Sequence, residues 1–275
     1  MKNLRRYFEA NRKMWDQFAK EHYSSDVYKT QDFVAGKTNL NSIELEELGD
    51  VAGKSLLHLQ CHFGLDTLSW AREGARVTGV DFSEEAIKLA RELAEETGLH
   101  ARFIQANIYD LPEVLDEQFD IVFTSYGVLC WLNDVNHWAE IVAHFLKPGG
   151  TFYIAEFHPV LWMFDNEAED DFHLICSYFH KPEPYEYHVD GSYTGAKIEP
   201  QFDYEWAHGM GDVISAIAAA GLRIEFLHEF PISPFQAFPF MKRGVDGYWR
   251  YEHAEIQVPL VYSIRAHKPD DKDLK

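Results

Sequence analysis

The stretch Leu56–Ala71, LLHLQCHFGLDTLSWA, decides the fold of this chain. Its first residues, Leu56–Gln60, form a largely apolar run, which is typical of a strand buried on both faces of a parallel sheet. The run breaks at a turn that contains Gly64, and a helix is predicted near Asp66–Glu73. A strand, a glycine turn and a helix in this order predict the start of an open α/β sheet, which binds ligands at the carboxyl ends of its strands.

Signals for strands and helices alternate after this turn. Such an alternation predicts a parallel sheet with helices on both faces. Ser83 is expected to cap the helix Glu84–Thr97 and Gly98 to end it. Pro148–Gly150 is expected to terminate the helix Asp134–Leu146. The predicted elements are the strands Arg76–Val80, Ala101–Ala106, Asp120–Thr124 and Thr151–Phe157 and the helices Glu84–Thr97 and Asp134–Leu146.

The last part of the chain returns to this pattern after an interruption. A helix near Asp212–Ala220 is followed by strands at Leu222–His228 and Ile256–Arg265, and no helix signal separates the two strands. Two strands joined without a crossover helix favour antiparallel pairing. We therefore predict a doubly wound α/β fold, with a mostly parallel seven-stranded sheet, an antiparallel last strand and helices on both faces.

Composition and charge argue against several classes of function. Acidic residues outnumber basic ones 45 to 25 without a basic stripe, so we expect no nucleic-acid partner. Cys61, Cys130 and Cys176 share no close spacing, which predicts neither a disulfide framework nor a thiolate zinc site. No signal-peptide stretch and no run of about 18 apolar residues occurs. We expect a cytoplasmic protein that binds no membrane.

An acidic residue follows the second predicted strand. Asp81 comes directly after Arg76–Val80, at the edge of the sheet where Gly64 is also expected. A carboxylate in this place can accept hydrogen bonds from two ribose hydroxyls, which predicts an adenosine-containing ligand. Turn glycines and acids near helix N-termini also occur for structural reasons alone, so the pair by itself leaves both interpretations open.

Five segments carry a resemblance to a known family through their order and spacing. They are LLHLQCHFG (56–64), VTGVDFS (77–83), QANIYDLP (105–112), FDIVFTSYGVL (119–129) and LKPGGTFYIAEF (146–157). Together they resemble the class I S-adenosylmethionine-dependent methyltransferases, and the last two strands are compatible with that fold. The resemblance implies S-adenosylmethionine as cofactor and methyl transfer to an acceptor, which we expect to be a small molecule.

The resemblance also implies roles for single residues. Asp81 is expected to bind the ribose and Phe82 to lie against the adenine face. Asn107 is expected to bind the adenine amino group with Ile108 packing nearby, and the turn Ser125–Gly127 is expected beside the methionine portion. The full set of residues expected around the cofactor is Gln60, Cys61, His62, Gly64, Asp81, Phe82, Ser83, Asn107, Ile108, Ser125 and Tyr126.

The first turn departs from the family in two ways. The family often carries three glycines where this chain has Gln60, His62 and Gly64. Its strand acid is replaced by His58. Side chains at positions 60 and 62 occupy space where backbone normally approaches the ligand, so either the loop takes another path or these side chains contact the methionine portion. A solvent-facing His62, a buried Gln60 amide and a core Cys61 are the structural alternatives.

The chemistry of the acceptor determines whether the protein must remove a proton. A hydroxyl, a carboxylic acid or an ammonium must lose one, and histidine is the natural proton acceptor near neutral pH. His158 and His208 are the candidates, and the alternative is that they cap or solvate loop ends. No HExxH arrangement or paired-cysteine spacing is present, so no metal site is expected.

The regions outside the core are expected to cover the site. An amphipathic helix over Tyr7–Tyr23 is predicted to fold over the cofactor, with Trp15 or Tyr28 closing the pocket. Asp190 and Gly191 predict a hairpin turn within an inserted cap. The chain divides into a helical extension (1–50), a cofactor-binding core (51–158), the cap (159–205), the C-terminal part of the core (206–267) and a flexible tail (268–275).

Two other functions are compatible with the sequence. A noncatalytic domain that binds S-adenosylmethionine or a partner protein would account for the altered first turn. A nicotinamide-dependent oxidoreductase also uses a strand, a glycine turn and an acid, but its GxGxxG motif is missing here. The acceptor atom is not determined by the sequence, and the oligomeric state is expected to be monomer or homodimer.

Overall fold

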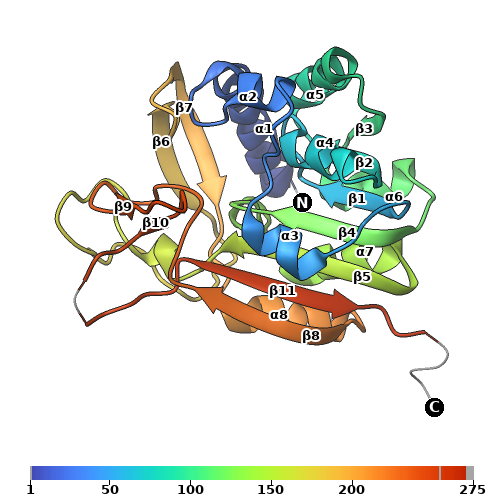
Figure 1. The fold of residues 1–275 in the computed structure, drawn as a ribbon. Coiled ribbons are helices and arrows are strands. Elements are labelled where there is room, and N and C mark those ends of the chain that lie inside the picture. The colour runs from blue at the N-terminus through green and yellow to red at the C-terminus, as the bar shows by residue number, and fades with distance from the viewer. Residues whose placement is uncertain (1, 254, 271–275) are drawn as a thin grey trace.

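The computed structural model describes residues 2–253 and 255–270 and contains a seven-stranded sheet in the order β3-β2-β1-β4-β5-β11-β8 (Figure 1). Neighbours from β3 to β5 are parallel, whereas β11 is antiparallel to both β5 and β8. The predicted mostly parallel sheet with an antiparallel last strand is confirmed. The strands are β1 (Ser55–Leu59), β2 (Arg76–Asp81), β3 (Ala101–Gln105), β4 (Phe119–Ser125), β5 (Leu146–Phe157), β8 (Arg223–Phe230) and β11 (Val261–His267).

Helices cover both faces of the sheet. Leu57 of β1 points to the face covered by α7 and α8, where it joins the largest apolar cluster, and Leu56 points to the opposite face, toward Trp70 of α4. This burial on both sides explains the continuous apolar sequence of β1. The helices are α1 (Lys2–Ser24), α2 (Thr30–Val34), α3 (Ser42–Leu48), α4 (Leu65–Arg72), α5 (Glu84–Thr97), α6 (Leu111–Val114), α7 (Val135–Phe145) and α8 (Met210–Ala219).

The ends of α5 follow directly from local chemistry. The Ser83 hydroxyl accepts a hydrogen bond from the Ala86 N–H at 3.0 Å, which satisfies one of the first free donors of the helix. Gly98 ends the helix in the left-handed conformation, at φ +66°, which costs glycine little. Both predicted caps and both predicted ends of this helix are confirmed.

Three local predictions were wrong. Pro148–Gly150 does not terminate α7, which already ends at Phe145, but lies within β5 where the β4–β5 register shifts in an irregularity. Such an irregularity tolerates a proline that cannot donate to the ladder. Ile256–Leu260 lies outside β11, because β8 ends at Phe230, the partner of Val261, and offers no further strand to pair with. Asp190 and Gly191 end β6 instead of forming its turn.

A β-hairpin formed by β6 (Tyr185–Gly191) and β7 (Lys197–Glu205), here called the cap hairpin, stands beside α1 (Figure 1). The Asn11 side chain of α1 donates to the Tyr204 carbonyl at 2.7 Å and accepts from the Tyr204 N–H at 2.9 Å, which joins the helix to β7. The remaining short elements are β9 (Lys242–Arg243), β10 (Trp249–Arg250) and the 3₁₀ turns η1 (Ile108–Asp110), η2 (Leu129–Trp131) and η3 (Leu161–Met163). In the described ranges, no helix combines the length and apolarity needed to cross a membrane.

Candidate active site at the carboxyl ends of the strands

The turn between β1 and α4, here called the first turn, is held by backbone hydrogen bonds. The Cys61 N–H donates to the Val80 carbonyl of β2, and the Gly64 N–H donates to the Cys61 carbonyl, both at 2.9 Å. Gly64 has φ +80°, and a Cβ there would lie 2.7 Å from the Phe103 ring, so this position requires glycine. Cys61 is 4% exposed and packs in the core, where burial raises the pKa of its thiol.

Gln60 and His62 adopt the left-handed conformation that glycines usually occupy, with φ of +57° and +51°. This conformation costs a non-glycine residue about 1–2 kcal/mol and persists only where the surroundings enforce it. The Gln60 amide donates to the Val128 carbonyl at 3.0 Å, which links the first turn to the loop after β4. The first turn therefore carries two side chains at backbone positions that favour glycine.

Asp81 joins the first turn to the end of β2. One carboxylate oxygen accepts from the His62 N–H at 2.8 Å and the other from the Ser83 N–H at 2.9 Å. Burial raises the pKa of Asp81 to about 6, although these N–H donors oppose the shift. The carboxyl group is therefore ionised at neutral pH, and each oxygen keeps a lone pair for a further donor.

The helix α1 covers this edge of the sheet. Its Asp16 carboxylate accepts from the Ser83 hydroxyl at 2.8 Å and from the Glu85 N–H at 3.3 Å, at the N-terminus of α5. The Trp15 ring lies with its centroid 5.2 Å from the His62 ring and 5.4 Å from the Trp131 ring. Trp15 thus lies against the first turn, and its expected role in closing a cofactor pocket stays a prediction.

His22 of α1 pairs with His62 of the first turn. The two rings meet through His22 Nδ1 and His62 Nε2, which are 3.1 Å apart, and the Tyr193 hydroxyl of the cap hairpin lies 3.4 Å from the same His22 nitrogen. Burial lowers the pKa of His22 to about 3 and that of His62 well below its usual value, so both rings are neutral. Since each neutral ring carries one N–H, the pair has one free donor and one free acceptor nitrogen.

Four buried polar atoms around the first turn have no hydrogen-bond partner among the described residues. They are Trp15 Nε1, His22 Nε2, Gln60 Oε1 and His62 Nδ1. An unpaired buried polar group costs about 1–3 kcal/mol, so such a concentration indicates a site completed by a polar ligand.

A cavity of about 360 Å³ lies between α1 and the ends of β2 and β3. Phe82 and Asn107, the two residues expected at the adenine from the resemblance, line this cavity. The Asn107 side chain accepts from the Tyr109 N–H at 3.0 Å, and Ile108 is buried in the core beneath. The other lining residues are Arg5, Phe8, Glu9, Arg12, Gln105 and Ala106.

Ser125 is the last residue of β4 and Tyr126 follows it. The hydroxyl groups of both form hydrogen bonds to carboxylates of helices. Ser125 donates to Asp66 at 2.8 Å and lies 3.3 Å from His58 Nε2, so the histidine that replaces the strand acid belongs to a buried polar network. Tyr126 donates to Glu44 of α3 at 2.9 Å. Burial raises the pKa of the fully buried Glu44 to about 7.

Glu156, at the end of β5, is a functional candidate that sequence reasoning missed. Its carboxylate accepts from the backbone N–H groups of Gly127, Val128, Leu129 and Phe157. It therefore fixes the loop that follows β4 and faces the first turn. In the sequence, Glu156 is marked only as an acid near the end of a predicted strand, and many surface acids have the same position.

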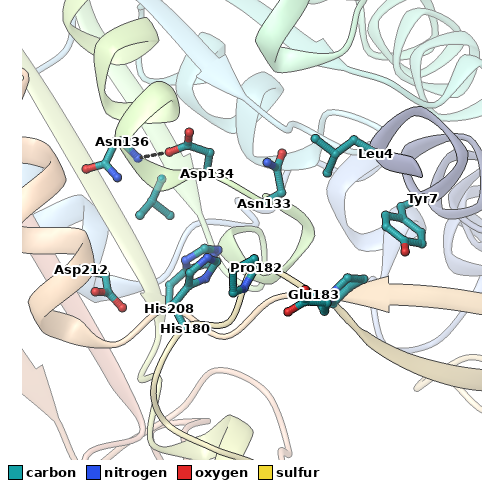
Figure 2. Close-up of a pocket in the computed structure, with 12 residues that line it drawn as sticks. Leu4, Tyr7, Asn133, Asp134, Asn136, His180, Pro182, Glu183, His208 and Asp212 are labelled. Atoms are coloured by element: carbon teal, nitrogen blue, oxygen red, sulfur yellow. Dashed lines mark hydrogen bonds between the residues drawn. The ribbon is translucent and has the colours of Figure 1, made fainter. Parts of the chain in front are cut away.

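The two predicted catalytic histidines lie in separate surroundings. His158 is 2.9 Å from Glu229 through Nε2 and accepts from the Val160 N–H through Nδ1 at 3.2 Å. His208 bonds to the Leu132 carbonyl at 2.6 Å and stacks on His180 beside a second cavity of about 540 Å³ (Figure 2). In the described ranges, neither histidine is hydrogen-bonded to the first turn, and no group of three metal-ligating side chains occurs.

Residues 57–154 match a family model described as a methyltransferase domain. Two relatives, the ubiquinone biosynthesis O-methyltransferases of Photorhabdus laumondii and Serratia proteamaculans, are 33% and 32% identical over 111 residues, 40% of this chain. The matched part spans about half of their length, 46%.

Solved structures share the fold over most of the chain. A putative S-adenosylmethionine-dependent methyltransferase from Listeria monocytogenes is 19% identical with a TM-score of 0.59, covering 83% of this chain and 96% of its own. An S-adenosylmethionine-dependent methyltransferase from Mesorhizobium loti is 21% identical with a TM-score of 0.57, covering 85% and 99%. Residues 57–154 therefore match a methyltransferase domain, and the chain around them shares the fold of these S-adenosylmethionine-dependent methyltransferases.

Proposed function

We propose that the chain transfers a methyl group from S-adenosylmethionine to a small-molecule acceptor. The observation that carries the proposal is the position of Asp81, which is ionised, attached to the first turn through the His62 N–H and able to accept two further hydrogen bonds. This arrangement suits the two ribose hydroxyls of adenosine. The cavity lined by Phe82 and Asn107 supports an adenine position beside it.

The unpaired atoms of the first turn fit the methionine end of the cofactor. Gln60 Oε1 accepts hydrogen bonds and Trp15 Nε1 donates them, which matches an ammonium and a carboxylate group. The free nitrogens of the His22–His62 pair supply one more donor and one more acceptor. The residues present therefore fit the cofactor, and the strain at positions 60 and 62 is retained for these contacts.

When bound, S-adenosylmethionine supplies an activated methyl group on a positively charged sulfur. The residues of the chain then position the reactants and exclude water. Trp15 and Trp131 cover the first turn, and Glu156 fixes the loop that approaches it. Positioning of this kind lowers a reaction barrier by up to about 7–11 kcal/mol. The roles of His158 and His208 as proton acceptors, and the monomer or homodimer state, stay predictions.

The function is tested by measuring S-adenosylhomocysteine after incubation of the chain with S-adenosylmethionine and a panel of small amines, alcohols, phenols, thiols and carboxylic acids. We expect product above the level without acceptor for at least one class. Binding of S-adenosylmethionine in calorimetry without product formation for any class would instead support the noncatalytic alternative. Absence of binding would contradict the proposal.

Replacing Gln60 or His62 with glycine is expected to weaken S-adenosylhomocysteine binding by about tenfold or more, while the unfolding free energy stays constant or rises by about 1 kcal/mol. Glycine relieves the strained backbone but removes the polar side chain. Calorimetry and urea unfolding measure the two effects. The control is Lys29→Gly, since Lys29 has φ +49° but is exposed. Unchanged binding in all three variants would refute a role for these side chains.

A further inference from the structure

One face of the cap hairpin carries acidic and amide groups. Gln201, Asp203 and Glu205 share this face of β7, because side chains along a strand alternate between its two sides. The register places Tyr187 opposite Asp203 and Tyr185 opposite Glu205, so both tyrosines share the same face. We call these five residues the acidic face.

Asp203 is the buried member of the acidic face, whereas Gln201, Tyr185 and Glu205 are partly exposed and Tyr187 is exposed. Asp203 is 5% exposed, and its Oδ1 has no hydrogen-bond partner, as is also true of Gln201 Nε2. Neither Asp203 nor Glu205 forms an ion pair with any residue in the described part of the chain. Burial raises the pKa of Asp203 to about 6, and burial together with the charge of Asp203 raises that of Glu205 to about 8. Buried carboxylates without a cation are costly, which indicates that a ligand supplies the positive charge.

The acidic face adjoins the loop that follows β4. The Trp206 N–H, directly after β7, donates to the Cys130 carbonyl of η2 at 2.8 Å. Burial raises the pKa of the Cys130 thiol, and the charges of Glu205, Glu156 and Asp203 raise it further. Cys130 in turn contacts the Gly127 carbonyl of the same loop at 3.8 Å. The face thus lies beside the loop whose Val128 carbonyl holds Gln60 of the first turn.

The other groups around the acidic face do not neutralise it. Tyr187 shares a hydrogen bond with the Cys176 thiol at 3.2 Å, and neither group can supply a cation. Glu156 adds negative charge but is occupied by backbone N–H groups. Lys181 is exposed, with its ammonium 5.6 Å from the centroid of the Tyr185 ring, and it forms no ion pair with Asp203 or Glu205. The local charge is therefore negative.

We propose that the methyl acceptor is a cationic amine whose ammonium group binds between Asp203 and Glu205, with Tyr187 beside it. The inference rests on the proposed methyl transfer and names its substrate class. An ammonium group supplies several N–H donors and the missing positive charge, and tyrosine rings favour cations. An alcohol or phenol leaves the ionised Asp203 carboxylate uncompensated, and an anionic acceptor is repelled by it.

The transfer step then balances in protons and electrons. The ammonium group gives one proton to the Glu205 carboxylate and becomes a neutral amine with a free lone pair. That lone pair forms the new nitrogen–carbon bond to the methyl group, while the carbon–sulfur bond breaks and its electron pair passes to sulfur. The products are a methylated ammonium group, S-adenosylhomocysteine and a protonated Glu205, which returns its proton to solvent.

Binding of two probes of equal shape tests the charge preference. Phenethylamine and 2-phenylethanol are titrated into the wild-type chain in the presence of saturating S-adenosylhomocysteine. We expect the amine to bind at least tenfold more tightly than the alcohol, and the double variant Asp203→Asn, Glu205→Gln to reduce the preference to less than twofold. The matched control is Glu186→Gln, because Glu186 is an exposed acid on the opposite side of the hairpin. Equal affinity for both probes, no binding of the amine, or equal loss in the control overturns the proposal.

A second measurement needs no ligand. Because both carboxyl groups have raised pKa values in the folded chain, the folded state holds extra protons between about pH 4 and pH 8. The unfolding free energy of the wild type should therefore fall across this window as pH rises, and the double variant should fall less and be the more stable at pH 9. If the unfolding free energies of the wild type and the double variant had the same pH dependence, Asp203 and Glu205 would not be unpaired, and the proposal would be overturned. If S-adenosylhomocysteine did not bind, only the proposed function would be contradicted. The pH dependence of stability is measured without this ligand and tests the acidic face by itself.

Discussion

Replacing Asp81 with alanine is expected to weaken S-adenosylhomocysteine binding by about 5- to 150-fold, or about 1–3 kcal/mol. The ribose hydroxyls lose the buried carboxylate that accepts their hydrogen bonds. Calorimetry on the folded variant measures the loss. Unchanged titration curves would refute the ribose assignment.

Asp81 also supports the fold, so its variant needs a control with a comparable structural role. Asp120 accepts from the Ser55 N–H at 2.8 Å at the opposite end of the strands, much as Asp81 accepts from the His62 N–H. Asp120→Ala is therefore expected to lower stability without changing affinity for the cofactor product. Loss of affinity in both variants would show that the Asp81 effect is structural.

The charge state of Asp81 gives the same experiment a pH dependence. Its pKa in the folded chain is raised to about 6, so the carboxylate is present above this pH and protonates below it. Hydroxyl donors favour the ionised form, and affinity should therefore fall as pH decreases from 7.5 to 5. In Asp81→Asn this part of the pH dependence should disappear.

Glu156→Ala is expected to reduce the unfolding free energy by about 2–4 kcal/mol, because backbone N–H groups of the loop after β4 lose their buried acceptor. The loop also holds Gln60 through the Val128 carbonyl, so affinity for S-adenosylhomocysteine should fall as well. Urea unfolding and calorimetry measure the two losses.

Two variants separate the role of this carboxylate from a general effect of removing an acid. Glu156→Gln keeps one acceptor oxygen and should show an intermediate loss of stability. Glu229→Ala removes a half-exposed acid from β8, two strands away from β5 in the sheet, and should change stability by less than about 1 kcal/mol. If Glu156→Ala were as stable as wild type, the loop would not depend on this carboxylate.

The candidate site was predictable where a role depends on residues close in sequence. Asp81 ends β2 and Gly64 lies in the turn after β1, so their place at the carboxyl edge comes from the strand pattern. The sequence also showed side chains at positions 60 and 62, where the family often has glycine. It did not show that Gln60 and His62 both adopt a positive φ. Neither Glu156 nor Glu205 could be identified as a functional residue from the sequence, because a single acid near a strand end is common on protein surfaces.

The sequence by itself determined the order of strands and helices, because apolar periodicity, helix caps and turn glycines act over a few residues, as α5 illustrates. Only the tertiary structure decided which distant side chains meet. His22 pairs with His62 across 40 positions, and Asn11 binds the Tyr204 backbone across 193. Such contacts arise when packing brings separate elements together to bury apolar surface, and they leave no periodic pattern along the chain.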